Sequence, residues 1–145
     1  MMRVVRLGRL ERLRRHERDS AAQALHRAQE DLASAAVAAA RARERRRQAE
    51  EKFLAEAARP QPALAFLREH EEVLERLDAE RGQFLKERHA QRLLAERRVQ
   101  LRRAMVREEQ MKSLGQWERR RQQREELRGE QRELDDLPPK EGPAW

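Results

Sequence analysis

The sequence predicts an all-α protein, a long antiparallel two-helix coiled-coil hairpin. Three observations predict this fold: a composition of helix formers, two long stretches without proline, and a heptad spacing of apolar residues in both stretches. Aromatic residues make up only 3% of the chain, and Ile, Thr and Tyr are absent, so a sheet lacks its usual side chains. Ala, Glu, Arg, Leu and Gln dominate instead, and all five favour helices.

Two closely spaced prolines, Pro60 and Pro62, divide the chain. Proline breaks a helix and biases the residue before it away from the helical region. The next proline is Pro138, so both flanking stretches are far longer than an ordinary globular helix and indicate a coiled coil. We therefore expect one hairpin over residues 1–137, with helix 1 at about 3–58, a turn at about 59–63, helix 2 at about 63–136, and a disordered tail at 138–145.

The residues that face the partner helix, here called the seam, follow alternating steps of three and four. In the second helix this rhythm is lost after Phe84 and resumes at Leu94, which predicts a stutter beside Gly82. The seam expected in the first helix is Ala21, Leu25, Ala28, Leu32, Ala35, Ala39, Ala42, Arg46, Ala49 and Phe53. The seam expected in the second helix is Leu67, His70, Leu74, Leu77, Arg81 and Phe84, then Leu94, Arg98, Leu101 and Met105.

Cysteine is absent, which excludes disulfides, cysteine-bound zinc and thiol chemistry. No apolar run approaches the roughly 18 residues of a membrane span, and no secretory hydrophobic region is recognisable. We therefore expect a cytoplasmic protein without membrane insertion.

Catalytic patterns are missing. The four histidines lie far apart without metal-ligand spacing, the glycines are isolated, and the three serines have no base nearby. A two-helix hairpin also lacks a concave pocket that could exclude water. The sequence therefore predicts a protein that is not an enzyme and that holds no cofactor or metal.

Two arginine-rich runs raise the question of nucleic acid. Residues 3–18 hold seven basic residues against two acidic ones, and residues 86–107 hold eight against two. Base-specific readers use side chains such as Asn, and single-strand readers use interleaved aromatics, but neither is present in these runs. We expect no specific nucleic-acid partner; an acidic protein surface fits the arginines as well.

The last part of the second helix, residues 117–137, is almost balanced in charge, with six arginines and seven acidic residues. Its few large apolar side chains are Trp117, Leu127, Leu134 and Leu137. Because the second helix is longer than the first by roughly 20 residues at 1.5 Å each, we expect this segment to protrude past the N-terminus as an overhang or to pair with it only loosely. It is either a docking element or a fraying helix end.

These features together resemble the FliJ/YscO family of type III secretion stalk proteins. The resemblance rests on the opening Arg-Leu turns within residues 5–15, on the Ala-rich seam, on Lys112-Ser113-Leu114, and on the closing Glu130-Gln131-Arg132-Glu133-Leu134-Asp135-Asp136. It covers nearly the whole chain.

The resemblance implies a non-enzymatic central stalk of a flagellar or injectisome export apparatus. Such a stalk docks its paired chain ends into the hexameric export ATPase, promotes hexamer assembly and couples ATP hydrolysis to export. Its turn end faces the export gate protein, secretion chaperones are further partners, and its place is peripheral to the inner-membrane export apparatus. The expected partner-binding residues are Arg3, Arg6, Arg9, Arg12, Trp117, Arg120, Arg124, Leu127, Gln131, Leu134 and Asp135. The expected turn-end residues are Phe66, Leu67 and Leu74.

Two alternatives stay open. A generic coiled-coil scaffold or adaptor would self-associate and have no ATPase partner. A basic coiled coil that binds nucleic acid without specificity would lose affinity steeply with salt.

Overall fold

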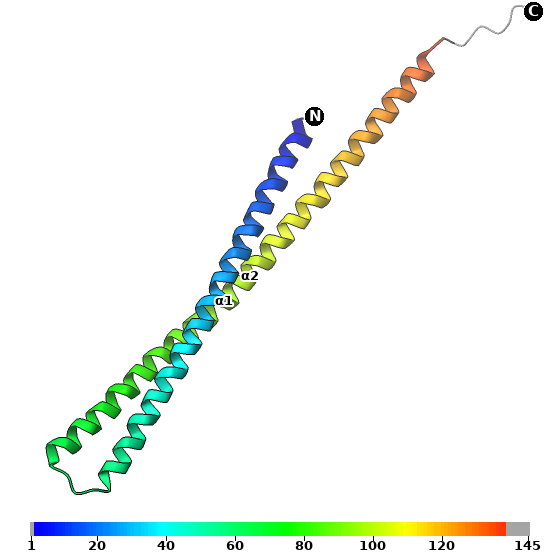
Figure 1. Ribbon diagram of the computed structural model, residues 1–145. Coiled ribbons are helices and arrows are strands. Elements are labelled where there is room, and N and C mark those ends of the chain that lie inside the picture. Colours follow the sequence, from blue (N-terminus) through cyan, green and yellow to red (C-terminus); the bar gives the residue numbers. More distant parts are fainter. Residues whose placement is uncertain (1, 139–145) are drawn as a thin grey trace, which may run out of the picture. The chain divides into compact units, whose positions relative to one another are not determined.

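The computed structural model describes residues 2–138 and contains two helices in that range. Helix α1 (Met2–Ala57) has 56 residues and helix α2 (Ala63–Asp136) has 74 (Figure 1). No strand occurs among the described residues. The expected all-α hairpin is confirmed, and the helix bounds lie within one residue of those expected. Except for Pro138, the expected tail at 138–145 lies outside the described residues.

The connection between the helices is short because proline ends α1 and starts α2. The Arg59 N–H donates to the Glu56 carbonyl at 3.0 Å, which closes the last turn of α1. The Pro62 carbonyl accepts hydrogen bonds from the N–H groups of Ala65 (3.0 Å) and Phe66 (3.2 Å). Pro62 itself has no N–H to leave unpaired, so it suits the residue just before a helix.

The chain divides into two compact units, and each helix contributes to both. Unit 1 comprises residues 1–19 and 103–145, and unit 2 comprises residues 20–102. In each unit a segment of α1 pairs with a segment of α2 that runs in the opposite direction.

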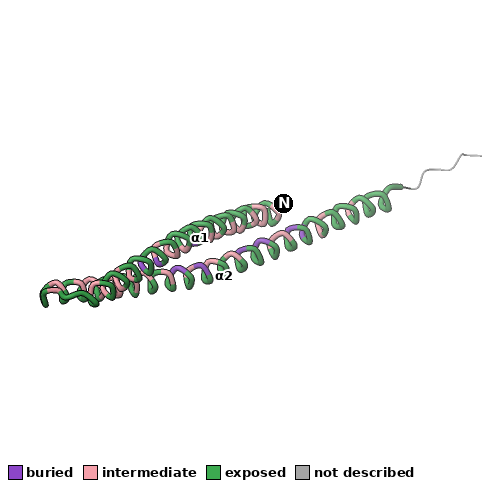
Figure 2. The backbone as a smooth tube through the Cα atoms, turned by 60° about the horizontal axis from the view of Figure 1, so that its bottom comes forward, coloured by how far each residue is buried: buried purple, intermediate pink, exposed green. Residues whose placement is uncertain are grey.

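In unit 2 the seam of α1 is the one expected from the sequence. All ten expected positions from Ala21 to Phe53 are buried or half-buried, and Ala28, Ala39 and Ala42 are the most buried of them (Figure 2). Ala90 and Leu94 are the buried residues that α2 contributes. Small side chains let two helices approach closely, but each removes little apolar area from water.

The expected seam of α2 is wrong at most of its positions. Leu67, Leu74 and Phe84 are 54%, 47% and 48% exposed, and no stutter occurs. His70, Arg81, Arg98 and Met105 are exposed as well, whereas Leu77 is half-buried, Leu94 is buried and Leu101 is half-buried. The observed seam is buried at Ala90, Leu94 and Ala104 and half-buried at Glu69, Val73, Arg76, Glu80, Gln83, Glu87, Arg97 and Leu101.

The shift has an electrostatic cause. The Glu80 carboxylate accepts a hydrogen bond from Arg46 Nε at 2.6 Å and lies 3.9 Å from Arg43 Nε. At this level of the seam an acidic residue therefore pairs with the seam arginine, where the leucine spacing had predicted an apolar contact. Arg18 pairs with Glu108 in the same way. The two arginines, Arg18 and Arg46, are 28 residues apart on α1, and the two glutamates, Glu80 and Glu108, are 28 residues apart on α2. That interval is four whole heptads, so the repeat continues without interruption in both helices.

Candidate partner-binding surfaces

The seam of unit 1 is held by ion pairs. The Arg18 guanidinium donates to the Glu108 carboxylate at 3.0 Å, and Lys112 Nζ lies 3.1 Å from the same carboxylate. Glu108 is buried, and both of these cations contact its carboxylate. Arg18 also donates to Asp19 at 2.8 Å, and the hydrogen bond to Asp19, followed by the charge of Glu108, raises the pKa of Arg18.

Gly115 allows the two helices of unit 1 to approach at one point. A Cβ at this position would meet the Glu11 carboxylate, which lies over the α2 backbone there. Arg119 Nη2 lies 3.4 Å from both oxygens of that carboxylate, and Glu118 beside it is only 4% exposed. Glycine therefore makes room for an acidic seam residue of α1.

The overhang is shorter than the sequence predicted. Trp117 was expected to begin it, but Glu118 is buried and Arg121 and Gln122 are half-buried. From Gln123 to Asp136 every residue except Gly129 is exposed. The estimate from the sequence failed because it used only the difference in helix length. It did not include the displacement of α2 along α1, here called the offset, which follows from the ion pairs across the seam.

The predicted N-terminal arginines are accessible. Arg3, Arg6, Arg9 and Arg12 are all exposed, and none of them forms an ion pair within residues 2–138. Because they recur every three residues, they wind gradually around the outer side of α1 rather than forming one straight row. Their guanidinium groups remain available to an acidic partner.

Trp117 lies on the outer surface of α2. Its side chain is 54% exposed, and the guanidinium of Arg121 lies 5.7 Å from the centre of its ring. A partly covered indole beside a cation is a suitable anchor for a partner, since buried Trp and Arg residues dominate many interfaces.

The remaining predicted contact residues of unit 1 are also on its surface. All of them are exposed: Arg120, Arg124, Leu127, Gln131, Leu134 and Asp135. Leu127 and Leu134 are one heptad apart, so they share one side of the exposed end of α2.

The turn end of unit 2 combines aromatic and aliphatic residues. Phe66 packs on Phe53 with ring centroids 5.1 Å apart, and His70 packs on Phe53 at 5.7 Å. Phe66 and Leu67 line a shallow hollow beside Pro60, and Leu67 and Leu74 are exposed. The sequence reasoning missed the Phe53–Phe66 contact because it assigned Leu67 rather than its neighbour to the seam.

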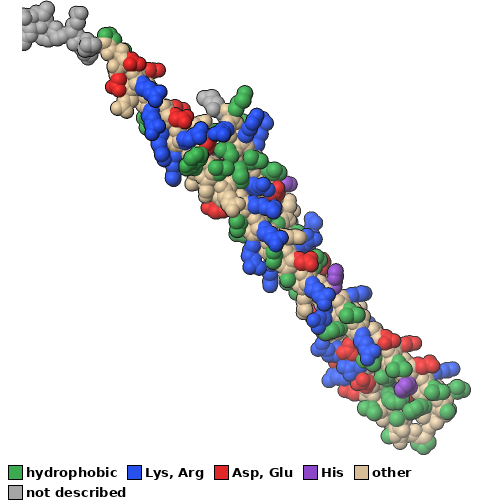
Figure 3. All heavy atoms as spheres, turned by 180° about the vertical axis from the view of Figure 1, so that it is seen from behind, with side chains coloured by type: hydrophobic (Ala, Val, Ile, Leu, Met, Phe, Trp, Pro, Cys, Tyr) green, Lys and Arg blue, Asp and Glu red, His purple; other side chains and the backbone are tan. Residues whose placement is uncertain are grey.

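The turn end of unit 2 and the N-terminal segment of unit 1 differ in charge. Residues 50–78 around the turn hold eight acidic and four basic residues, whereas residues 3–18 hold seven basic and two acidic ones. In the view of Figure 3, hydrophobic and acidic side chains gather at the turn end, and Lys and Arg side chains are frequent on unit 1. The two surfaces therefore fit partners of different charge.

Within residues 2–138, no group of three or more His, Asp or Glu side chains is placed to hold a metal ion. Over the same residues, neither helix contains a segment with the length and apolar character needed to cross a membrane.

Comparison of the chain with protein-family models, with curated proteins and with solved structures found no match.

Proposed function

We propose that this protein is a non-enzymatic stalk or adaptor of a type III secretion export apparatus, and that unit 1 binds the hexameric export ATPase. The observation that carries the proposal is the surface of unit 1, where, among residues 2–138, arginines without ion pairs and an exposed Trp117 adjoin the exposed end of α2. The resemblance of the sequence to the FliJ/YscO family supplies the identity of the partner.

The physical properties of unit 1 support a docking role. Its seam depends on ion pairs such as Arg18–Glu108 rather than on large apolar layers, so an enclosing partner would add stability that the hairpin lacks. The guanidinium group of arginine pairs with a carboxylate in a fixed geometry. Such pairs across an interface set the orientation of the two proteins and the rate at which they associate.

In the proposed role the stalk carries out no chemistry of its own. Bound within the ATPase ring, it would favour hexamer assembly and couple ATP hydrolysis to export. The acidic turn end, with Phe66, Leu67 and Leu74, would face the export gate protein, and secretion chaperones would be further partners. The protein would then act at the cytoplasmic side of the inner membrane, peripheral to the export apparatus.

The test is a binding titration of the cognate export ATPase with the full chain and two variants. Trp117→Ala and the double charge reversal Arg6→Glu/Arg9→Glu are each expected to weaken binding at least tenfold, about 1.4 kcal/mol. All three side chains are exposed, so helicity measured by circular dichroism should not change.

Val37→Ala is the matched control, because Val37 is an exposed apolar residue in unit 2 and outside the proposed surface. Its affinity should equal that of the unmodified chain. If the unmodified chain shows no affinity for the ATPase, the stalk function is wrong. In that case a generic coiled-coil adaptor becomes the better description.

A further inference from the structure

Helix α2 carries a second apolar stripe that α1 covers only in part. Leu67, Leu74, Leu77 and Phe84 alternate with His70 and Arg81 in steps of three and four, one residue out of phase with the seam. Leu67, Leu74 and Phe84 are about half exposed, although this spacing is the one that coiled-coil helices bury. We call these four apolar residues the second stripe.

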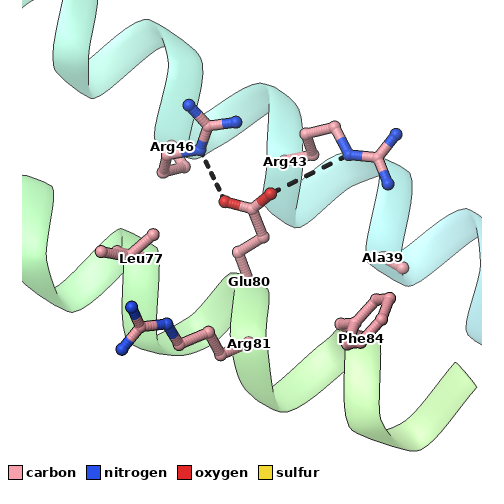
Figure 4. A pocket seen from close by; sticks show the side chains of 7 residues that line it. All are labelled: Ala39, Arg43, Arg46, Leu77, Glu80, Arg81 and Phe84. Carbon is pink, nitrogen blue, oxygen red and sulfur yellow. Dashed lines mark hydrogen bonds and ion pairs between the residues drawn. The ribbon is translucent and has the colours of Figure 1, made fainter. Parts of the chain in front are cut away.

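The second stripe borders a shallow groove between the two helices of unit 2. Figure 4 shows Leu77, Arg81 and Phe84 on α2 opposite Ala39, Arg43 and Arg46 on α1. The groove has a volume of about 260 Å³. Glu80 turns toward Arg46 and Arg43, so it closes the floor of the groove with ion pairs.

The outer edge of this surface has a cation beside an aromatic ring. The Arg88 guanidinium lies 5.6 Å from the centre of the Phe84 ring. On α1, Leu54 is exposed at the same turn end of unit 2. The groove and the second stripe therefore present apolar area with charged borders, the arrangement of a helix-binding surface.

The charges along the second stripe reverse sign at its middle. Over residues 67–78, toward the turn end, five acidic residues stand against two basic ones, and Glu71, Glu75 and Asp78 are among the acidic residues. Over residues 79–92 four basic residues stand against two acidic ones, and Arg81, Arg88 and Arg92 are among the basic residues. A surface with this pattern is complementary to itself when a copy is turned end for end, which is the requirement of a two-fold symmetric interface.

We propose that the second stripe is the interface through which two copies of this chain form an antiparallel dimer. In this arrangement Leu74 of one copy lies near Phe84 of the other. Asp78 then faces Arg81, and Glu71 faces Arg88. The inference concerns unit 2 alone and does not rest on the proposed stalk function.

Sedimentation equilibrium on the full chain tests the proposal. The unmodified protein is expected to be a dimer at about 100 μM, and Leu74→Gln/Phe84→Gln is expected to raise the dimer dissociation constant at least tenfold, about 1.4 kcal/mol. The matched control is Val37→Gln/Val99→Gln, which changes two exposed valines outside the second stripe and should leave the dimer intact. A monomer at this concentration for the unmodified chain would overturn the proposal.

Charge exchange separates a second copy from an unrelated partner. Glu71→Arg/Asp78→Arg should weaken the dimer at least tenfold, because arginine then faces arginine. Adding Arg81→Glu/Arg88→Glu to the same chain should restore it, since every facing pair regains opposite charges. If the fourfold variant folds but does not recover, the surface is not paired with itself in this register.

Single spin labels test the antiparallel direction, because the chain has no cysteine of its own. Ala79→Cys lies near the two-fold axis, so its labels should be about 20 Å apart, one helix spacing plus the label arms. Ala95→Cys lies about 16 residues from the axis, so its labels should be about 50 Å apart at 1.5 Å per residue on each helix. Short distances at both positions would show a parallel dimer and contradict the proposal.

Discussion

Glycine residues in α2 differ in what surrounds them. Gly82 has no atom near the place where a Cβ would stand, whereas Gly115 lies under the Glu11 carboxylate. Both lie in the interior of a helix, where glycine is less favourable than alanine.

Gly82→Ala should therefore stabilise the protein by about 0.5–1 kcal/mol. Gly115→Ala should stabilise it less or destabilise it, because Glu11 must move and its contact with Arg119 is lost. Urea denaturation of the two variants and the unmodified chain measures the difference. An equal gain at both positions would contradict the close approach at Gly115.

A second residue-level prediction concerns Glu44. Arg47 Nη2 donates to its carboxylate at 2.8 Å, and this hydrogen bond, followed by the charge of Arg47, lowers the pKa of Glu44. A lowered pKa in the folded state contributes stability that is present above the pKa of the unfolded chain. That contribution is lost as the pH falls through the lower pKa of the folded state.

An NMR titration of the Glu44 carboxyl carbon measures this pKa. The value should lie below that of an unperturbed glutamate, and Arg47→Gln should return it toward the ordinary value. Arg27→Gln, a change at an exposed arginine further along α1, is the control and should leave it unchanged. An unchanged pKa in Arg47→Gln would mean that the pair does not persist in solution.

At the scale of the helix, the two seams differ in how well the sequence predicts them. The seam of α1 was predicted correctly because alanines and leucines occupy it from Ala21 to Phe53 without competition. In α2 the bulkiest residues lie one position away from the true seam, which contains Glu69, Glu80 and Gln83. The apolar spacing of α2 therefore indicates the wrong stripe. The true seam is set by ion pairs with α1, and the sequence of α2 alone does not show which of its residues form them.

Leucine truncations test this corrected register. Leu94→Ala should destabilise the protein by about 2–4 kcal/mol, because Leu94 is 8% exposed. Leu74→Ala should cost clearly less, because Leu74 is 47% exposed in a single chain. The comparison is made by thermal denaturation at low protein concentration, where any dimer has dissociated. An equal loss of stability in the two variants would contradict the corrected register and support the one expected from the sequence.

At the scale of the whole molecule, the sequence predicted the helices and the turn closely because proline marks the turn. It misplaced arginines of the seam, since Arg81 and Arg98 are exposed and Arg76 and Arg97 are half-buried instead. It misplaced Trp117 in the overhang, because the length of the overhang depends on the offset fixed by Arg18–Glu108 and Glu11–Arg119. Those pairs join residues about 90 or more positions apart, and local sequence patterns do not encode them.

The offset between the helices determines where α2 can be shortened without disturbing unit 1. Removing everything after residue 116 would remove the buried Glu118 and the Glu11–Arg119 contact, so it would loosen unit 1 itself. Ending the chain after Arg124 removes most of the exposed end and keeps both features. Loss of function in this shorter chain can then be attributed to the overhang.

The most direct test of the proposed stalk function is the rate of ATP hydrolysis by the cognate export ATPase as the full chain is added. The account predicts a saturable increase in the rate with the full chain, and a loss of most of that increase with the chain that ends at Arg124. An ATPase whose hydrolysis rate does not change with added full-length protein, at concentrations where the hairpin is fully helical, would contradict it.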